Sequence, residues 1–296
     1  MFAMKQMNDL LKTFCSADKL FDSYQLVEPQ THEVFDYDSN DNLIKTEKYC
    51  YTTCGRFVPC ENCTSKRTCN DQNQYMKLEY VNDRVLLFLS RPVRVENKLF
   101  SLELIKNVTD SLSIPSYYHT EKRDVEKVIQ QLNDLSIHDA FTGMYNKVYI
   151  KNEIDNFVQQ MEKTDDKLIG IAIDIDDYTQ VNMMYGHGVG NQVLYYIASA
   201  VKQVAGLYRG WTGRLGPDEF GLFFKNMSMS EIETICIKLD EMISQHLFEA
   251  KGKEFKMTFS YGVAELEQTE DADDYIDRLY FRLRAAQGSK KEADQE

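Results

Sequence analysis

The strongest constraint on the fold is a near-continuous apolar run, residues 168–173, that ends directly at the carboxylate of Asp174. Such a run is typical of a strand buried on both faces, so we expect it at the centre of a sheet. The expected helices cover residues 147–161, 191–204, 230–246 and 274–286, and the expected strands form a hairpin over 213–224 and a strand over 255–264. This alternation predicts one mixed α+β domain over residues 138–288.

The part of the chain before this domain has a different pattern. Apolar residues recur at helical spacing over residues 1–14, which predicts a short amphipathic helix. Over residues 15–110, short extended segments alternate with turn residues, most clearly at 85–90 and 99–105. We therefore expect a small antiparallel α+β domain in this region.

A connecting segment over residues 111–137 joins the two expected domains. Within it, Val125, Ile129 and Leu132 follow helical spacing and charged residues fill the other face, so residues 117–137 predict one helix. The apolar stripe fits either a plain surface helix or a short parallel coiled coil between two protomers. At the far end of the chain, residues 289–296 are expected to form a charged tail.

Charge and hydropathy exclude several classes of protein. The chain has 47 acidic and 34 basic side chains and a formal net charge of -13, whereas non-specific nucleic-acid binding needs clusters of lysine and arginine. No apolar run approaches the roughly 20 residues that span a bilayer, and the first residues lack the features of a secretory signal. We therefore expect a cytoplasmic protein that binds neither nucleic acid nor membranes.

Five of the seven cysteines crowd into one short stretch, which contains a C-x-x-C pair. A disulfide framework needs an oxidising compartment, which nothing in the sequence supports, so metal binding is the better interpretation. The expected ligands of a Zn²⁺ ion or an iron–sulfur cluster are Cys50, Cys54, Cys60 and Cys63, with Cys69 as a substitute. Reduced cysteines without a metal, and a zinc ion with a purely structural role, remain open alternatives.

Two separate groups of carboxylates point to chemistry in the second domain. Asp174 follows the expected central strand, and Asp218 and Glu219 lie at the tip of the expected hairpin. Acidic residues at one strand end are ordinary, but two such groups on adjacent strands can hold Mg²⁺ for phosphoryl transfer on a nucleoside triphosphate. Glycines between residues 182 and 191 would let the backbone approach a ligand closely.

Five segments, in order, resemble the signatures of GGDEF domains, the diguanylate cyclase family. They read DAFTGMYNK from residue 139, DIDDY from 174, NMMYGHGVGN from 182, GPDEF from 216 and TFSYGVA from 258. The resemblance implies a central sheet flanked by helices over residues 138–288. It also implies the condensation of two GTP molecules to cyclic di-GMP, with one GTP on each of two facing domains, and therefore a homodimer.

The resemblance also implies roles for single residues at matching positions. The Mg²⁺ ligands would be Asp174, the carbonyl of Ile175, Asp218 and Glu219. The catalytic residues would be Asp218 and Glu219, one of which would help to deprotonate the attacking 3′-hydroxyl group. The substrate-binding residues would be Asn182 and Asn191 at the guanine edge, Tyr178, and Arg284 at the phosphates.

The signature departs from the family pattern at several positions. Pro217 replaces a glycine, which fixes φ near -65° and removes an N–H group. Asn191 replaces an aspartate, so one amide donor stands where guanine needs a second acceptor, and this change should weaken the preference for guanine. The product-inhibition motif would fall on Leu207 and Gly210, and it is absent. A degenerate domain that binds a nucleotide as a regulatory or dimerisation module is the alternative function.

The strand-rich first domain resembles a PAS sensor domain. The resemblance rests on SRPV from residue 90 and LELIKNVTD from residue 102, in which Asn107 replaces the usual aspartate. It implies a metal-binding sensor, a signalling helix and a cyclase output in one chain. An adaptor whose metal domain recruits another protein is a third hypothesis.

Overall fold

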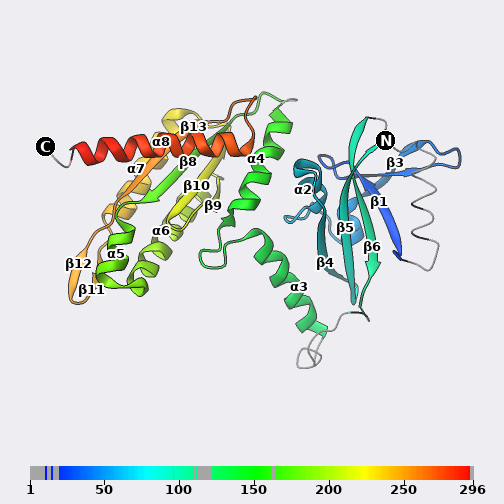
Figure 1. The fold of residues 1–296 in the computed structure, drawn as a ribbon, viewed down its shortest axis with the longest axis horizontal. Helices are drawn as coiled ribbons and strands as arrows, with labels where there is room; N and C mark the ends of the chain where they lie inside the picture. Colours follow the sequence, from blue (N-terminus) through cyan, green and yellow to red (C-terminus); the bar gives the residue numbers. More distant parts are fainter. Residues whose placement is uncertain are drawn as a thin grey trace. The chain divides into compact units, whose positions relative to one another are not determined.

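The computed structural model describes Leu11, Cys15 and residues 20–95, 97–109, 111, 122–161 and 164–293. The chain divides into two compact units, Met1–Ser136 and Ile137–Glu296 (Figure 1). The helix predicted over residues 1–14, apart from Leu11, and the first turn of the helix predicted over 117–137 lie outside the described residues. Across the described ranges, no helix is both long enough and apolar enough to cross a membrane.

The first unit is built on a six-stranded antiparallel sheet with the order β3-β2-β1-β6-β5-β4. Its strands are β1 (Ser23–Val27), β2 (Glu33–Tyr37), β3 (Leu43–Tyr49), β4 (Tyr75–Val81), β5 (Arg84–Val95) and β6 (Lys98–Asn107). The strands predicted at 85–90 and 99–105 lie within β5 and β6, and every residue of β6 pairs with a residue of β5. Leu26, Phe100 and Leu102 are buried together with Leu11 and Val95 in the core of this unit. The predicted antiparallel α+β class is confirmed.

In the described part of this unit, three helical segments accompany the sheet. They are the 3₁₀ segment η1 (Cys50–Cys54), the short helix α2 (Thr64–Asp71) and the connecting helix α3 (Lys122–Ile137). Helix α2 begins directly after Cys63 and packs against β5 and β6. The sequence patterns did not predict η1 or α2, because neither carries an apolar stripe.

The second unit contains a five-stranded sheet with the order β13-β8-β10-β9-β7. Its strands are β7 (Tyr145–Asn146), β8 (Leu168–Ile175), β9 (Trp211–Arg214), β10 (Glu219–Lys225) and β13 (Phe259–Glu265). Its helices are α4 (Lys147–Met161), α5 (Tyr178–Tyr185), α6 (His187–Leu207), α7 (Met229–Ser244) and α8 (Ala272–Ala293). A separate two-stranded ribbon joins β11 (Phe248–Ala250) to β12 (Lys253–Phe255).

Strand β8 is an interior strand of this sheet, between β13 and β10, whereas β10 takes the middle position of the five (Figure 1). Ile171 and Ile173 face a core formed with α6 and α7, whereas Leu168 and Ala172 face a second core formed with α4 and α8. Side chains of a strand alternate between faces, so burial on both sides requires apolar residues at successive positions. Full burial of each isoleucine stabilises the fold by roughly 1.5–3 kcal/mol.

The structure differs from the expected elements in three places. Helix α6 begins at His187, before the start expected at residue 191, and the unpredicted helix α5 precedes it; Gly186, with a φ of 88°, separates the two helices. The strand expected over 255–264 begins only at Phe259, since Phe255 pairs in the small ribbon. Helix α8 continues to Ala293, past the expected end at residue 286.

Candidate active site

The two carboxylate groups meet at one end of the central strand pair. Glu219, the first residue of β10, lies directly opposite Asp174 in the antiparallel register with β8. The backbone N–H of Ile175 donates to the carbonyl of Asp218 at 3.3 Å. Antiparallel pairing therefore brings Asp174, Asp218 and Glu219 together, although 43 residues separate the first two in the chain.

The hairpin turn that carries Asp218 is held by Arg214. The guanidinium donates to the carbonyl of Gly216 at 3.1 Å, to that of Pro217 at 2.6 Å and to the carboxylate of Asp139 at 3.1 Å. Asp139 in turn accepts from the backbone N–H and the hydroxyl of Thr142, both at 2.8 Å. The segment that begins at residue 139 thus braces the base of the hairpin.

Pro217 is accommodated without backbone strain in this turn. None of the residues from Leu215 to Glu219 has a positive φ, so the turn does not need the conformational freedom of a second glycine. Gly216 is different, because a Cβ atom there would collide with the carboxylate of Glu219. The departure from the family pattern therefore falls at a position where proline fits.

A cavity of about 370 Å³ opens beside the carboxylates. Of the residues singled out in the sequence, Asp174, Ile175, Asp218 and Tyr178 line it. Glu219 is not in the lining and instead accepts a hydrogen bond from the hydroxyl of Tyr280 at 2.8 Å. Arg284 is exposed on α8, one turn beyond Tyr280. The cavity brings together four of the predicted residues, whereas Glu219 and Arg284 are not among the residues that line it.

The cavity also contains groups that the sequence did not identify. Gln287 donates to Asp174 at 2.8 Å, and Lys290 donates to Asp176 at 2.6 Å. Ser260 and Thr258 donate to the same Asp176 carboxylate, each at 2.7 Å. Gln287 lies seven residues after Tyr280, and Lys290 lies three residues after Gln287. This helical spacing is the signal that could have placed the three residues on the same face of one helix.

Asp174 and Asp176 differ sharply in their electrostatics. Burial, reinforced by the charges of Asp218, Glu219 and Asp176, raises the pKa of Asp174 to about 7. Burial would also raise the pKa of Asp176, but hydrogen bonds from Lys290, Ser260 and Thr258 hold it below its ordinary value. Negative charge at Asp174 is thus uncompensated, which is the condition that favours a bound cation.

The donors at this end of β8 suit Mg²⁺ in kind. Carboxylates and a backbone carbonyl are the hard oxygen ligands that this ion prefers, and the crowded charge at Asp174 would be relieved by it. Within the described ranges, no three His, Cys, Asp or Glu side chains are already disposed to hold a metal ion.

The two residues predicted at the guanine edge occupy neighbouring helices. Asn182 lies on α5 and packs so closely against α6 that a Cβ atom at Gly190 would collide with its carboxamide. Its Oδ1 atom is buried and accepts no hydrogen bond from any described group. Asn191 is exposed on α6, and neither asparagine lines the carboxylate cavity.

The predicted cysteine ligands surround a second, very small cavity in the first unit. Cys50, Cys54, Cys60 and Cys63 all line this space of about 10 Å³, whereas the substitute ligand Cys69 is buried on α2 outside it. Cys50 also lies 3.8 Å from Nδ1 of His32, a neighbour that the sequence did not indicate. All four cysteines thus border one space, although within the described ranges no three ligating side chains are already disposed around a single ion.

A lysine shares the cysteine cavity. Lys77, which is 8% exposed, donates to the sulfur of Cys60 at 3.4 Å and lies 3.2 Å from the carboxylate of Glu79. A hydrogen bond between the two thiols lowers the pKa of Cys60 and raises that of Cys63. This unit therefore carries its own buried cation among its acidic and sulfur groups.

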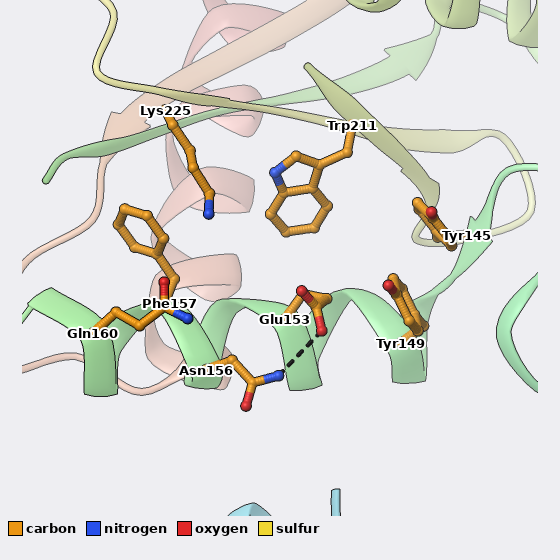
Figure 2. A pocket seen from close by; sticks show the side chains of 8 residues that line it. All are labelled: Tyr145, Tyr149, Glu153, Asn156, Phe157, Gln160, Trp211 and Lys225. Atoms are coloured by element: carbon orange, nitrogen blue, oxygen red, sulfur yellow. Dashed lines mark hydrogen bonds between the residues drawn. The ribbon is translucent and has the colours of Figure 1, made fainter. Parts of the chain in front are cut away.

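A third cavity, of about 230 Å³, lies between α4 and the sheet of the second unit (Figure 2). Figure 2 shows Tyr145, Tyr149 and Trp211 around it, and Trp211 stacks on Phe223 with ring centroids 4.5 Å apart. None of the residues predicted to bind substrate or metal lines this space. The predicted site and this aromatic hollow are thus distinct.

Comparison with known proteins identifies the family of the second unit. Residues 136–293 match the family described as "Diguanylate cyclase, GGDEF domain". This match covers just over half of the 296 residues, and the chain belongs to the GGDEF family.

Individual relatives match the same region. The chain is 25% identical over 166 residues to the bifunctional diguanylate cyclase/cyclic di-GMP phosphodiesterase MucR of Pseudomonas aeruginosa. The aligned region covers 56% of this chain and 24% of MucR. The chain is also 29% identical over 135 residues to the diguanylate cyclase DgcN of Escherichia coli. That aligned region covers 45% of this chain and 33% of DgcN. The chain thus spans a third or less of the length of these relatives.

Among solved structures, the crystal structure of the coiled coil and GGDEF domain of DgcB from Caulobacter crescentus, in complex with c-di-GMP, is similar in fold. The TM-score is 0.52 at 22% sequence identity, and the match covers 56% of this chain and 88% of that one. The GGDEF fold predicted for residues 138–288 is therefore confirmed.

Proposed function

We propose that the second unit condenses two GTP molecules to cyclic di-GMP, under the control of the first unit. The observation that carries this proposal is the cross-strand pairing of Asp174 with Glu219, with Asp218 beside them at a cavity of about 370 Å³. The relatives named as diguanylate cyclases support the choice of reaction.

The residues of this site would divide the work as follows. Asp174, the Ile175 carbonyl, Asp218 and Glu219 would hold Mg²⁺, which when bound neutralises charge on the triphosphate. Asp218 or Glu219 would accept the proton of the 3′-hydroxyl as its oxygen bonds to the α-phosphorus of the second GTP and pyrophosphate leaves. Arg284 and Lys290, six residues apart on α8, would supply fixed positive charge near the phosphates.

The reaction requires two copies of the second unit, so we infer that the chain acts as a homodimer. Helix α3 offers a surface for pairing, because Leu132 and Leu135 are 54% and 58% exposed on it. Parallel pairing of α3 would bury these side chains and orient the two output units. Light scattering at working concentration tests this, and a strictly monomeric chain would contradict it.

We further infer that the first unit is a PAS-like sensor. A Zn²⁺ ion or an iron–sulfur cluster on Cys50, Cys54, Cys60 and Cys63 would make it a metal-bearing sensor. Elemental analysis and an absorption spectrum distinguish these forms, since an iron–sulfur cluster gives iron and visible bands whereas zinc is colourless.

The test of the cyclase is a product assay on the purified full chain with Mg²⁺ and GTP, ATP or their mixture. Cyclic di-GMP from GTP is the expected product. The proposal is wrong if no cyclic dinucleotide forms and calorimetry detects no binding of either nucleotide.

Base preference can be tested at Asn191. Asn191→Asp restores a carboxylate that accepts two guanine N–H groups, so the ratio of GTP to ATP turnover should rise about tenfold. The exposed Gln192→Glu change on the same helix is the matched control, and it should leave the ratio unchanged.

A nucleotide-binding module without turnover is the second candidate. It is favoured by Lys290, whose ammonium already occupies Asp176, and by the replacement of an aspartate by Asn191. In that case GTP or ATP would raise the melting temperature of the chain while no product formed.

A further inference from the structure

The C-x-x-C segment of the first unit lies between a buried ammonium group and the connecting helix α3. On one side, Lys77 on β4 donates to the sulfur of Cys60 at 3.4 Å. On the other side, Asn62, which lies between the two cysteines, donates to Oγ of Ser136 on α3 at 2.8 Å. One short loop therefore contacts both a polarised thiol and the helix that leads to the second unit.

The two cysteines differ in their exposure to solvent. Cys60 is partly exposed, whereas Cys63 is 8% exposed and directly precedes α2. Such a pair combines a cysteine on the more exposed side, which can attack an external disulfide, with a sheltered cysteine that can then resolve the mixed disulfide. The ammonium of Lys77 beside Cys60 would stabilise negative charge on the Cys60 sulfur.

We propose that Cys60 and Cys63 form a dithiol that exchanges with low-molecular-weight disulfides, and that closure of the Cys60–Cys63 disulfide is transmitted to α3 through Asn62. In the first step, the Cys60 sulfur loses its proton and attacks a disulfide RSSR, which forms a mixed disulfide and releases one RSH. In the second step, the Cys63 sulfur attacks the Cys60 sulfur, its proton goes to the departing thiolate, and a second RSH leaves. The protein loses two electrons and two protons, and RSSR gains them.

The contacts of Asn62 explain why α3 would respond. Its carboxamide donates to Ser136 and also, at 3.5 Å, to Asn133, while its oxygen accepts from Arg67 on α2 at 3.1 Å. Asn133 separately holds α3 to the sheet by donating to the carbonyl of Leu78 at 2.9 Å. A disulfide brings two sulfurs to about 2.05 Å, so the intervening loop must contract and draw Asn62 away from its partners. Loosening of the last turns of α3 follows.

The same four sulfurs could instead bind a metal, and the two uses make different demands. A tetrahedral metal site needs Cys50 and Cys54 as much as Cys60 and Cys63. A dithiol needs only the last two. The contacts favour the dithiol, because Lys77 already provides a positive charge at Cys60.

The experiment uses the full chain, purified under reducing conditions and then treated with oxidised glutathione. Peptide mapping by mass spectrometry should find the Cys60–Cys63 disulfide, and hydrogen exchange of the backbone amides of residues 130–136 should accelerate about fivefold, as expected for the loss of one hydrogen bond. Cys60→Ser and Cys63→Ser should abolish both changes. Cys54→Ser should retain both, since it leaves the pair intact.

Asn62→Asp is the decisive variant for the connection to α3. The carboxylate still accepts from Arg67 but cannot donate to Ser136, so the disulfide should form as in the unaltered chain while oxidation no longer changes exchange in residues 130–136. The proposal is overturned if the purified chain carries one zinc or an iron cluster that blocks all four thiols. It is equally overturned if the disulfide forms and α3 exchange does not change.

These readouts do not depend on cyclase activity. A chain that makes no cyclic di-GMP could still show the disulfide and its effect on α3, and an active cyclase could lack both. Failure of the proposed function and failure of the dithiol are therefore distinguishable.

Discussion

The cysteine cluster of the first unit and the carboxylate cluster of the second unit differ in how their negative charge is compensated. In the first unit, Lys77 lies buried among Cys60, Glu79 and the cysteine cavity, so the compensating cation is part of the chain. In the second unit, Asp174 and Glu219 face each other, and no lysine or arginine in the described ranges forms an ion pair with either. We call the first cluster closed, because a lysine of the chain supplies its cation. We call the second cluster open, because it lacks such a cation and is suited to an added one.

The largest expected effect concerns the open cluster. Asp218→Asn should lower cyclic di-GMP formation by on the order of 10²–10³-fold, because it removes a carboxylate that would hold Mg²⁺ or accept the 3′-hydroxyl proton. The measurement is the initial rate of product formation with Mg²⁺ and GTP.

Asp240→Asn, an exposed change of the same chemistry on α7, is the control for this variant and should leave the rate unaltered. Equal rates for Asp218→Asn and the unaltered chain would show that the open cluster is not a catalytic site. The lack of a compensating lysine or arginine at the open cluster would then have no role in catalysis.

The next effect concerns the closed cluster. Lys77→Met should destabilise the first unit by about 3 kcal/mol, because removal of one partner leaves buried acidic groups without their cation. Hydrogen exchange of the β4 and β5 amides measures this loss. Trp211, the only tryptophan, lies in the second unit, so its fluorescence should report an unchanged unfolding transition there.

Lys45→Met provides the matched comparison within the same unit. Lys45 pairs with Glu33 at 2.5 Å on the exposed surface, where solvent screens the charges, and its loss should have no measurable effect. If both lysine variants behave alike, the ammonium of Lys77 does not hold the cluster together.

The smallest effect is a pH dependence of the open cluster. The pKa of Asp174 is raised from 3.8 to about 7, so the folded second unit binds this proton more tightly than the unfolded chain does. The contribution of Asp174 to the free energy of unfolding is therefore highest below about pH 4, falls as the pH rises to about 7, and stays constant above that pH. Asp174→Asn should then stabilise the metal-free unit at pH 8 by on the order of 1 kcal/mol, since solvent screens this half-exposed group, and should have no effect at pH 4.

Urea unfolding followed by Trp211 fluorescence measures this difference. Addition of Mg²⁺ should stabilise the unaltered chain at pH 8 more than it stabilises Asp174→Asn. A variant that is less stable than the unaltered chain at pH 8 without Mg²⁺ would show that Asp174 is already compensated.

Elements with a strong apolar pattern were predictable from the sequence. The run over 168–173 predicted the buried interior strand β8, and the helical stripe over 147–161 predicted the bounds of α4. Elements held by polar contacts were not predictable. Helix α5 buries only Val181, so it carries no apolar stripe. Helix α2 buries Thr64, Ser65 and Thr68, whose hydroxyl groups bond to other parts of the unit rather than to an apolar core.

By itself, the sequence determined the class of the second unit and the convergence of its carboxylates. Antiparallel pairing of two strands with strong apolar patterns leaves little choice of register, so Asp174 had to meet the hairpin tip. Only the tertiary structure decided what surrounds the charged groups. Gln287 and Lys290 lie 113 and 114 residues along the chain from their partners, and Lys77 lies 17 residues from Cys60. Hydrogen bonds between polar side chains at such separations leave no periodic signal in the sequence. Whether a cluster of anions is closed or open to a cation is therefore a property of the folded chain.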